Sequence, residues 1–352
     1  MFGAVLRVLT CCACVAVLLP LLLLPLLCCC CCCCGAVRWR VGANRHCVCT
    51  PSAVSQRPMM QDTPLTNILY ISGASAAGTA ALHKSKRYID MAKRQVSPVA
   101  ENLVRTFSTR LASTLEGLAV PKTKEWWTKY LKGEAEFRGV KMGDVRNSVN
   151  ALVEEMNIKA PHTSIETRLA MYEECCKSRY TEEKLAGFLL LAEHSLSELR
   201  DDDVEQLGRP LASGDVADWN SCDWLCVKVI GPFINASGDA GHFQTRAEKV
   251  AEWRFADALW QRRAAAVSFV YLASKNPEPY QGFRDLLIKI SAANVKDPAR
   301  FSQTSVGWLL RELSVVEPER VKEFVASHKD SMSEEAAKSA YKKLGQGKKR
   351  KR

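Results

Sequence analysis

The 352-residue sequence predicts an all-α fold, an α-solenoid of paired helices, from about residue 98 to residue 345. Apolar residues recur there with the 3.6-residue period of amphipathic helices, in one segment after another. The alternation of Val, Ile and Thr between turns that would indicate β-strands is missing throughout this part of the sequence. Similar helical segments also return at a regular interval. These three patterns favour stacked helices over a sheet.

The N-terminal residues 1–58 read as an apolar leader rich in cysteine, with seven consecutive cysteines from Cys28 to Cys34. Three interpretations compete: a targeting leader, a membrane anchor, or sequence translated upstream of the true start, for which Met59 and Met60 are alternative starts. Residues 59–97 are small, polar and aperiodic, and we interpret them as a flexible linker. Because periodicity suited to a core begins only near residue 98, we expect residues 1–58 to be dispensable for folding and activity.

The helical region begins with "SPVAENLVRTFSTRLASTLEGLA", which opens with a capping serine, Ser97. The segments "TSIETRLAMYEECCKS" and "TEEKLAGFLLLAEHSL" follow, each amphipathic and each led by Ser or Thr. Four segments, the first of them within "TEEKLAGFLLLAEHSL", share a pattern in which a polar residue leads into small and apolar ones. Their first residues, spaced by about 40 positions, are Lys184, Asp223, Arg263 and Thr304. A 40-residue period with two helices per unit is typical of HEAT-like repeats.

Equivalent positions of successive repeats line up along one face of a solenoid. Lys184, Asp223, Arg263 and Thr304 are therefore expected to form a ridge. Residues one or two helical turns away join the same face: Trp219, Trp308 and Arg311. Indoles beside a carboxylate and several cations are unusual for plain packing. This mixture suits something planar and cationic that is held near a polyanion.

The formal net charge is +11, which favours an anionic partner such as nucleic acid or a membrane surface. Five of these positive charges lie in the basic tail, residues 346–352, which ends in "GKKRKR". Such a cluster is of the kind that nuclear import receptors bind, so we expect a nuclear protein. The alternative is a solvated tail that attracts DNA. A mitochondrial or membrane address competes if the leader is real.

No motif indicates a bound cofactor or metal. The histidines are scattered, and Cys175, Cys176, Cys222 and Cys226 lack zinc-ligand spacing, so we interpret these four as reduced, partly buried thiols. A glycine-rich phosphate loop, a "GxSxG" elbow and an "HExxH" motif are absent from the sequence. Nucleotide hydrolase, esterase and metalloprotease functions therefore lack support.

Several segments resemble the AlkD-like alkylpurine DNA glycosylases over roughly residues 98–345: "WNSCD" from Trp219, "WQRRAA" from Trp260, "SVGWLLRE" from Ser305 and "YLKGEAEFRGVKMGDVR" from Tyr130. The resemblance implies that Asp223 is the catalytic aspartate and that Trp219 and Trp308 contact DNA at its side. Arg263 and Arg311 match arginines that bind the DNA backbone. Thr304 departs from the basic or larger polar residue usual there. Thr304 and Lys184, together with the two arginines, are the residues that we expect to bind DNA.

The chemistry of these residues agrees with that resemblance. Alkylation at N3 or N7 makes a purine cationic and weakens its glycosidic bond, and cleavage gives the sugar oxocarbenium character. A nearby carboxylate stabilises this cation, an indole face attracts a cation, and arginines bind phosphates. We therefore expect a monomeric, cofactor-free glycosylase that acts on duplex DNA carrying alkylated purines. The resemblance implies catalysis without flipping the base.

Plainer interpretations of the same residues remain open. Asp223 can be a structural partner of Arg263 that joins two repeats. Taken alone, Trp219 and Trp308 are more often core residues, and the two arginines can be ordinary solvated cations. We assign Trp224 and Trp260 to the core and expect Trp126 and Trp127 to staple the first repeat. The alternative function is a non-catalytic HEAT-like module that binds DNA or a protein.

Overall fold

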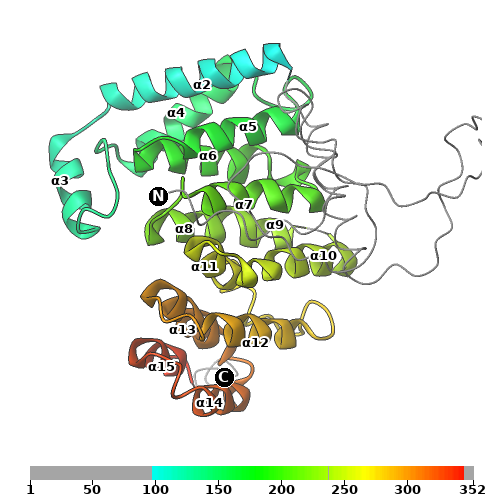
Figure 1. Ribbon diagram of the computed structural model, residues 1–352. Helices are drawn as coiled ribbons and strands as arrows, with labels where there is room; N and C mark the ends of the chain where they lie inside the picture. The colour runs from blue at the N-terminus through cyan, green and yellow to red at the C-terminus, as the bar shows by residue number, and fades with distance from the viewer. Residues whose placement is uncertain (1–96, 237, 345–352) are drawn as a thin grey trace, which may run out of the picture. The chain divides into compact units, whose positions relative to one another are not determined.

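The structure, a computed structural model, describes residues 97–236 and 238–344. These residues form an all-α helical-repeat fold, as predicted from the sequence (Figure 1). Within them the backbone forms no strand, and Glu136 and Tyr180 make an isolated bridge. The predictions for the leader, the linker before Ser97 and the basic tail concern residues outside the described part.

The helices follow one another with short connections. The α-helices are α2 (Pro98–Gly117), α3 (Pro121–Tyr130), α4 (Met142–Glu155), α5 (Ile165–Cys176), α6 (Thr181–His194), α7 (Val204–Ser213), α8 (Trp219–Leu225), α9 (Gly231–Asn235), α10 (Ala240–Ala251), α11 (Leu259–Val267), α12 (Phe283–Asn294), α13 (Arg300–Leu313), α14 (Pro318–Ser327) and α15 (Glu334–Tyr341). A π-helical turn, η5 (Cys226–Ile230), joins α8 to α9. Short 3-10 turns are η3 (Leu196–Glu198), η4 (Asp201–Asp203) and η6 (Glu252–Phe255).

Successive helices stack so that each packs on elements from the neighbouring unit. Helix α2 packs on α4 and α5, and α5 packs on α6. A second series of contacts runs from α6 to α8, from α8 to α11, from α11 to α13 and from α13 to α15 (Figure 1). This second series carries all the residues of the expected ridge, so the fold brings their helices side by side.

Two hydrophobic clusters hold the stack together. The smaller joins α2, α4, α5 and α6 around Phe107 and Val149, and the larger extends from α5 to α15 around Phe233 and Phe269. Complete burial of such a side chain contributes roughly 1.5–3 kcal/mol. The partly buried Trp224 packs against both clusters. Trp260 packs against the larger cluster, so both tryptophans contact the core as the sequence predicted.

The expected serine caps are present at two helix starts. Ser97 accepts a hydrogen bond from the Ala100 N–H of α2, and Ser164 accepts one from the Thr167 N–H of α5, both 3.3 Å long. Each cap satisfies a backbone donor that the helix leaves unpaired. Helix α6 differs, because Thr181 is its first residue and no side chain caps it. The acids that follow, Glu182 and Glu183, instead bind the segment after α3.

Among the described residues, no helix combines the length and apolar character needed to cross a membrane. Nor does this part of the chain hold three or more His, Cys, Asp or Glu side chains arranged to ligate a metal. The four cysteines in it are unbridged and buried, which agrees with the prediction of reduced thiols.

Candidate functional site on helices α8, α11 and α13

Helix α8 begins at Trp219 because Asp218 caps it. The Asp218 carboxylate accepts a 2.8 Å hydrogen bond from the Ser221 N–H, and the Asp218 backbone is extended. Asp223 follows Trp219 by four residues, so both side chains lie on one face of the helix. One face of α8 therefore presents an indole and a carboxylate together.

Asp223 forms a bidentate ion pair with Arg263 of α11. Arg263 Nε donates to Asp223 Oδ1 and Arg263 Nη2 donates to Oδ2, both over 2.8 Å. The Arg263 side chain is only 6% exposed and that of Asp223 is 17% exposed. This parallel geometry is the strongest that a guanidinium and a carboxylate can adopt.

The third nitrogen of the same guanidinium connects α11 to α13. Arg263 Nη1 donates to the Phe301 carbonyl over 2.7 Å and to Thr304 Oγ1 over 3.1 Å. Asp223 on α8, Arg263 on α11 and Thr304 on α13 are thus linked by hydrogen bonds across three helices. The 40-residue register predicts that these three positions are neighbours. Thr304, which departs from the family pattern, serves here as an acceptor for Arg263.

Burial and charge act in opposite directions on this pair. Burial raises the pKa of Asp223 above its ordinary value, and the positive charge and hydrogen bonds of Arg263 oppose that rise. Burial alone would lower the pKa of Arg263, but attraction to Asp223 outweighs it and raises that pKa. Without Arg263, the carboxyl would therefore hold its proton to a still higher pH.

Trp219 faces an aromatic group on α3. Its ring lies 5.9 Å from that of Tyr130, which stacks in turn on Trp126 at 5.2 Å. Tyr130 is 53% exposed and Trp126 is 57% exposed, so the expectation that Trp126 staples the first repeat is wrong. Trp127 does pack inward, where it stacks on Phe137 at 5.4 Å.

Sequence reasoning missed Tyr130 and Trp126 as neighbours of the site. Tyr130 could have been identified from the sequence, because it is the first residue of one segment that carries the family resemblance. No local signal marked Trp126. The four-residue spacing of the two rings on α3 explains their stacking, since residues one turn apart lie one above the other.

Trp308 and Arg311 extend the site along α13. The Arg311 guanidinium lies 5.6 Å from the centre of the Trp308 ring, and its Nη2 is 3.0 Å from Glu312 Oε1. Arg311 is 27% exposed, in contrast to Arg263. The Trp308 indole N–H is buried and has no hydrogen-bond partner among the described residues. The indole thus contacts a cation and stays half-buried against the core.

Lys184 does not bind its neighbours in the ridge. Its ammonium donates to the carbonyl oxygen of Asp215, in the loop that precedes α8. Helix α6 does pack on α8, so the residue is near the site but its charge is turned to the loop. Its expected contact with DNA stays a prediction.

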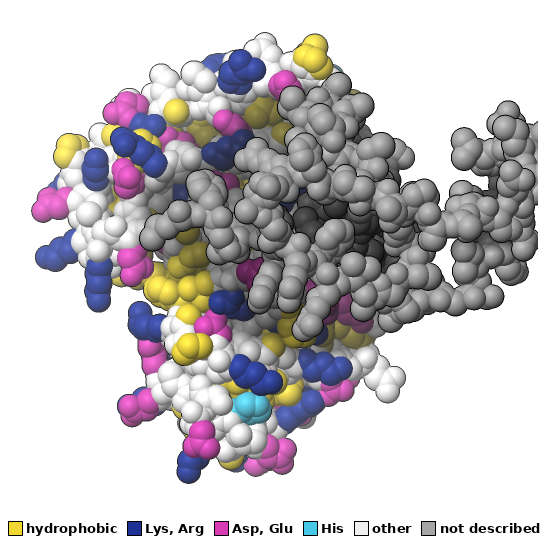
Figure 2. Space-filling view, viewed as in Figure 1, with side chains coloured by type: hydrophobic (Ala, Val, Ile, Leu, Met, Phe, Trp, Pro, Cys, Tyr) yellow, Lys and Arg dark blue, Asp and Glu magenta, His cyan; other side chains and the backbone are white. Residues whose placement is uncertain are grey.

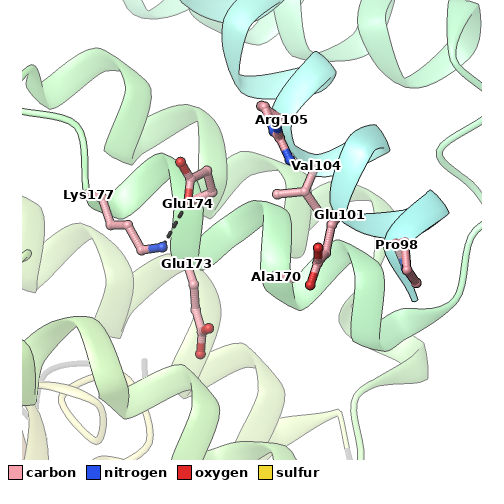
Figure 3. A pocket seen from close by; sticks show the side chains of 8 residues that line it. All are labelled: Pro98, Glu101, Val104, Arg105, Ala170, Glu173, Glu174 and Lys177. Carbon is pink, nitrogen blue, oxygen red and sulfur yellow. Dashed lines mark hydrogen bonds and ion pairs between the residues drawn. The ribbon is translucent and has the colours of Figure 1, made fainter. Parts of the chain in front are cut away.

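The surface around these helices combines apolar and charged groups. Figure 2 shows hydrophobic side chains gathered over α8, where the surface is hollowed between α3 and α13, with basic side chains nearby. A separate cavity of about 620 Å³ lies between α2 and α5, and its lining includes Glu101, Glu173 and Lys177 (Figure 3). None of the expected site residues lines that cavity.

The comparisons with known proteins agree with this arrangement. The family described as DNA alkylation repair enzyme matches residues 111–344. A solved structure, a predicted DNA alkylation repair enzyme from Enterococcus faecalis, is similar in fold at 20% sequence identity and a TM-score of 0.52. That likeness covers 64% of this chain and 97% of the other. No curated protein matches the chain.

The described residues thus form an all-α helical-repeat protein in which neighbouring helices carry a paired carboxylate, two indoles and two arginines. The family match spans most of the stack, including every residue of the site described above. The chain belongs to the DNA alkylation repair enzyme family. This confirms the resemblance found in the sequence and supports an enzyme with a role in DNA repair.

Proposed function

We propose that the protein is a monofunctional DNA glycosylase that removes cationic N3- or N7-alkylated purines from duplex DNA. The observation that carries the proposal is the placement of Asp223. The charge of Arg263 opposes the rise in the pKa of this carboxyl that burial causes, and the Asp223 side chain stays 17% exposed, one turn from Trp219. Family membership supports DNA as the substrate.

The reaction needs little more than stabilisation of positive charge. The bond between the sugar C1′ and the purine nitrogen breaks, and its electron pair neutralises the alkylated base. The sugar is left with oxocarbenium character. A carboxylate beside it stabilises that charge, and water adds to C1′ with loss of a proton. Asp223 would supply the negative charge, and the indoles would face the cationic base or the sugar.

The two arginines would divide the remaining work. All three nitrogens of Arg263 bind protein atoms, so we assign this residue to orienting Asp223 instead of contacting the DNA backbone. Arg311 is more exposed and lies on the same face, which suits contact with a phosphate. Like the monomeric state, these roles are part of the proposal.

One observation favours the alternative, a non-catalytic module that binds DNA or a protein. Each oxygen of Asp223 already accepts a hydrogen bond from Arg263, which is also what a purely structural link between repeats requires. The partial exposure of the Asp223 side chain, 17%, favours the enzyme, because a purely structural pair can be fully buried.

A base-release assay on methylated duplex DNA tests the proposal. The purified protein should release 7-methylguanine faster than the uncatalysed reaction, and Asp223→Asn should remove most of that excess. Thr304→Val, which changes an acceptor of Arg263 but leaves the carboxylate, is the matched control and should keep most of the activity. A folded protein that binds the methylated duplex and releases no base would leave the binding module as the function.

A further inference from the structure

The helix that carries Asp223 changes its winding soon after that residue. Helix α8 continues through the π turn η5 into α9, and the Gly231 N–H donates to the Cys226 carbonyl, five residues back. Pro232 follows and has no N–H to donate. Such turns insert one residue into a helix and are frequent at functional sites.

Gly231, the first residue of α9 after η5, lies close against the end of α11. A Cβ atom built on it would lie 2.8 Å from the Ser268 carbonyl oxygen, at the end of α11. Contacts below 3.0 Å with backbone do not occur at real Cβ atoms, so one of the helices would have to move. Gly231 has φ −60° and ψ −51°, an ordinary helical conformation. The glycine is therefore needed for space and not for backbone freedom.

We call the interface between α11 and the continuous segment α8–η5–α9 the seam. Small groups line the rest of this seam. The Cys222 thiol lies 3.5 Å from the Trp260 carbonyl, and the Cys226 thiol lies 4.0 Å from the Ala264 carbonyl. These thiols are fully buried, so at both contacts a cysteine sulfur lies against the backbone of α11. The Asp223–Arg263 pair bridges the same two helices.

We infer that Gly231 is a positioning residue for Asp223: by allowing α11 to approach η5, it sets the helix separation at which Arg263 reaches both carboxylate oxygens. The kinetic consequences of this inference rest on the proposed function, whereas its electrostatic consequences do not. A wider seam would lengthen the hydrogen bonds from Arg263 and weaken its hold on the ionised carboxylate. The pKa of Asp223 would then rise further, because burial would be less opposed.

Few other charges can replace Arg263. Asp218, just before α8, is negative and acts in the same direction as burial. On α6, which packs on α8, Lys184 is turned to the Asp215 carbonyl. On α13, Arg300 is engaged by Glu335. A change at the seam should therefore appear directly in the titration of Asp223.

The test compares three glycine-to-alanine variants of the full chain. Gly231→Ala wedges the seam. Gly187→Ala makes an equally tight contact, 2.8 Å from Cys175 Cβ, between α5 and α6. Gly143→Ala, in α4, meets nothing within 4 Å. The titration of the Asp223 carboxyl is followed by carbon-13 NMR, with its signal assigned by loss in Asp223→Asn, and the pH profile of 7-methylguanine release is measured beside it.

We expect Gly231→Ala and Gly187→Ala both to lower the melting temperature. Only Gly231→Ala should raise the Asp223 titration midpoint, by about one pH unit, which is part of what a charged partner at this range contributes. The acid limb of base release should move by the same amount. An Asp223 titration midpoint that is the same in Gly231→Ala and Gly187→Ala would overturn the inference.

A second variant with a smaller added volume keeps the inference testable if Gly231→Ala does not fold. Cys226→Val adds bulk at the next contact of the same seam and should shift the midpoint in the same direction by less. If the wild-type protein releases no base while Gly231→Ala still shifts the titration, the proposed function fails and the positioning role stands. If base release is normal and no seam variant shifts the titration midpoint of Asp223, the proposed function stands and the positioning role of Gly231 fails.

Discussion

Arg263 donates two parallel 2.8 Å hydrogen bonds to Asp223, one to each carboxylate oxygen, and thereby joins α8 to α11. A pair of this kind has two effects. It keeps a buried carboxylate charged, which catalysis requires, and it ties two repeats together, which folding requires. Loss of activity in a single substitution therefore does not separate the two roles.

A double substitution separates them. Asp223→Asn should slow base release by one to three orders of magnitude, about 2–4 kcal/mol for one electrostatic partner of a transition state. It should also lower stability, by up to about 3–5 kcal/mol, because the buried guanidinium loses its counter-charge. Adding Arg263→Met should restore much of the melting temperature and none of the rate. Recovery of the rate in the double variant would contradict a catalytic role for Asp223.

The rate should depend on pH through the same carboxyl. On the proposed function Asp223 acts as a carboxylate, so enzymatic release should fall as the pH drops through its pKa. Because burial raises that pKa, the fall should begin above the usual range of aspartate, about 3.9. Arg263→Met removes the opposing charge and should move the acid limb to higher pH. The measurement is release at each pH with the uncatalysed rate subtracted, and an unmoved limb would show that another group titrates.

Salt dependence should distinguish the two arginines. Each phosphate contact contributes about one unit to the slope of log binding constant against log salt concentration. Arg311→Ala should therefore reduce the slope by roughly one, measured on an unmodified duplex. Arg263→Met should leave the slope unchanged, because this side chain is 6% exposed and fully bonded within the protein. A smaller slope in the Arg263 variant would mean that the arginine leaves Asp223 for a phosphate.

The parts of the site that repeat along the chain could be predicted from the sequence. Asp223, Arg263 and Thr304 occupy equivalent places in successive units, so periodicity alone brings them together. Lys184 has an equivalent place too, but its long flexible side chain reaches a nearer carbonyl, that of Asp215. The spacing of the repeats predicts the position of a residue's backbone. It does not predict which acceptor the end of a long side chain will bind.

The aromatic side of the site depends on contacts that no local pattern contains. Helix α3 buries none of its residues, and the segment after it is held by Glu182, whose carboxylate accepts the Gly139 N–H over 2.8 Å and the Val140 N–H over 3.0 Å. Gly139 has a positive φ of 100°, where a side chain would be strained. These long-range contacts bring Tyr130 to Trp219. The π turn is equally invisible to an analysis based on a 3.6-residue period.

On the proposed function the protein would work amid alkylating chemicals, and its buried thiols then have a consequence. Electrophiles that damage DNA also attack cysteine, and they react with the thiolate form. Cys175, Cys176, Cys222 and Cys226 are at most 2% exposed, and burial raises the pKa of the Cys175, Cys176 and Cys222 thiols. The Cys222 thiol, next to Asp223 in the sequence, is thus kept both buried and protonated. In the described part of the chain, the proposed repair site would therefore be shielded from the reagents whose damage it would remove.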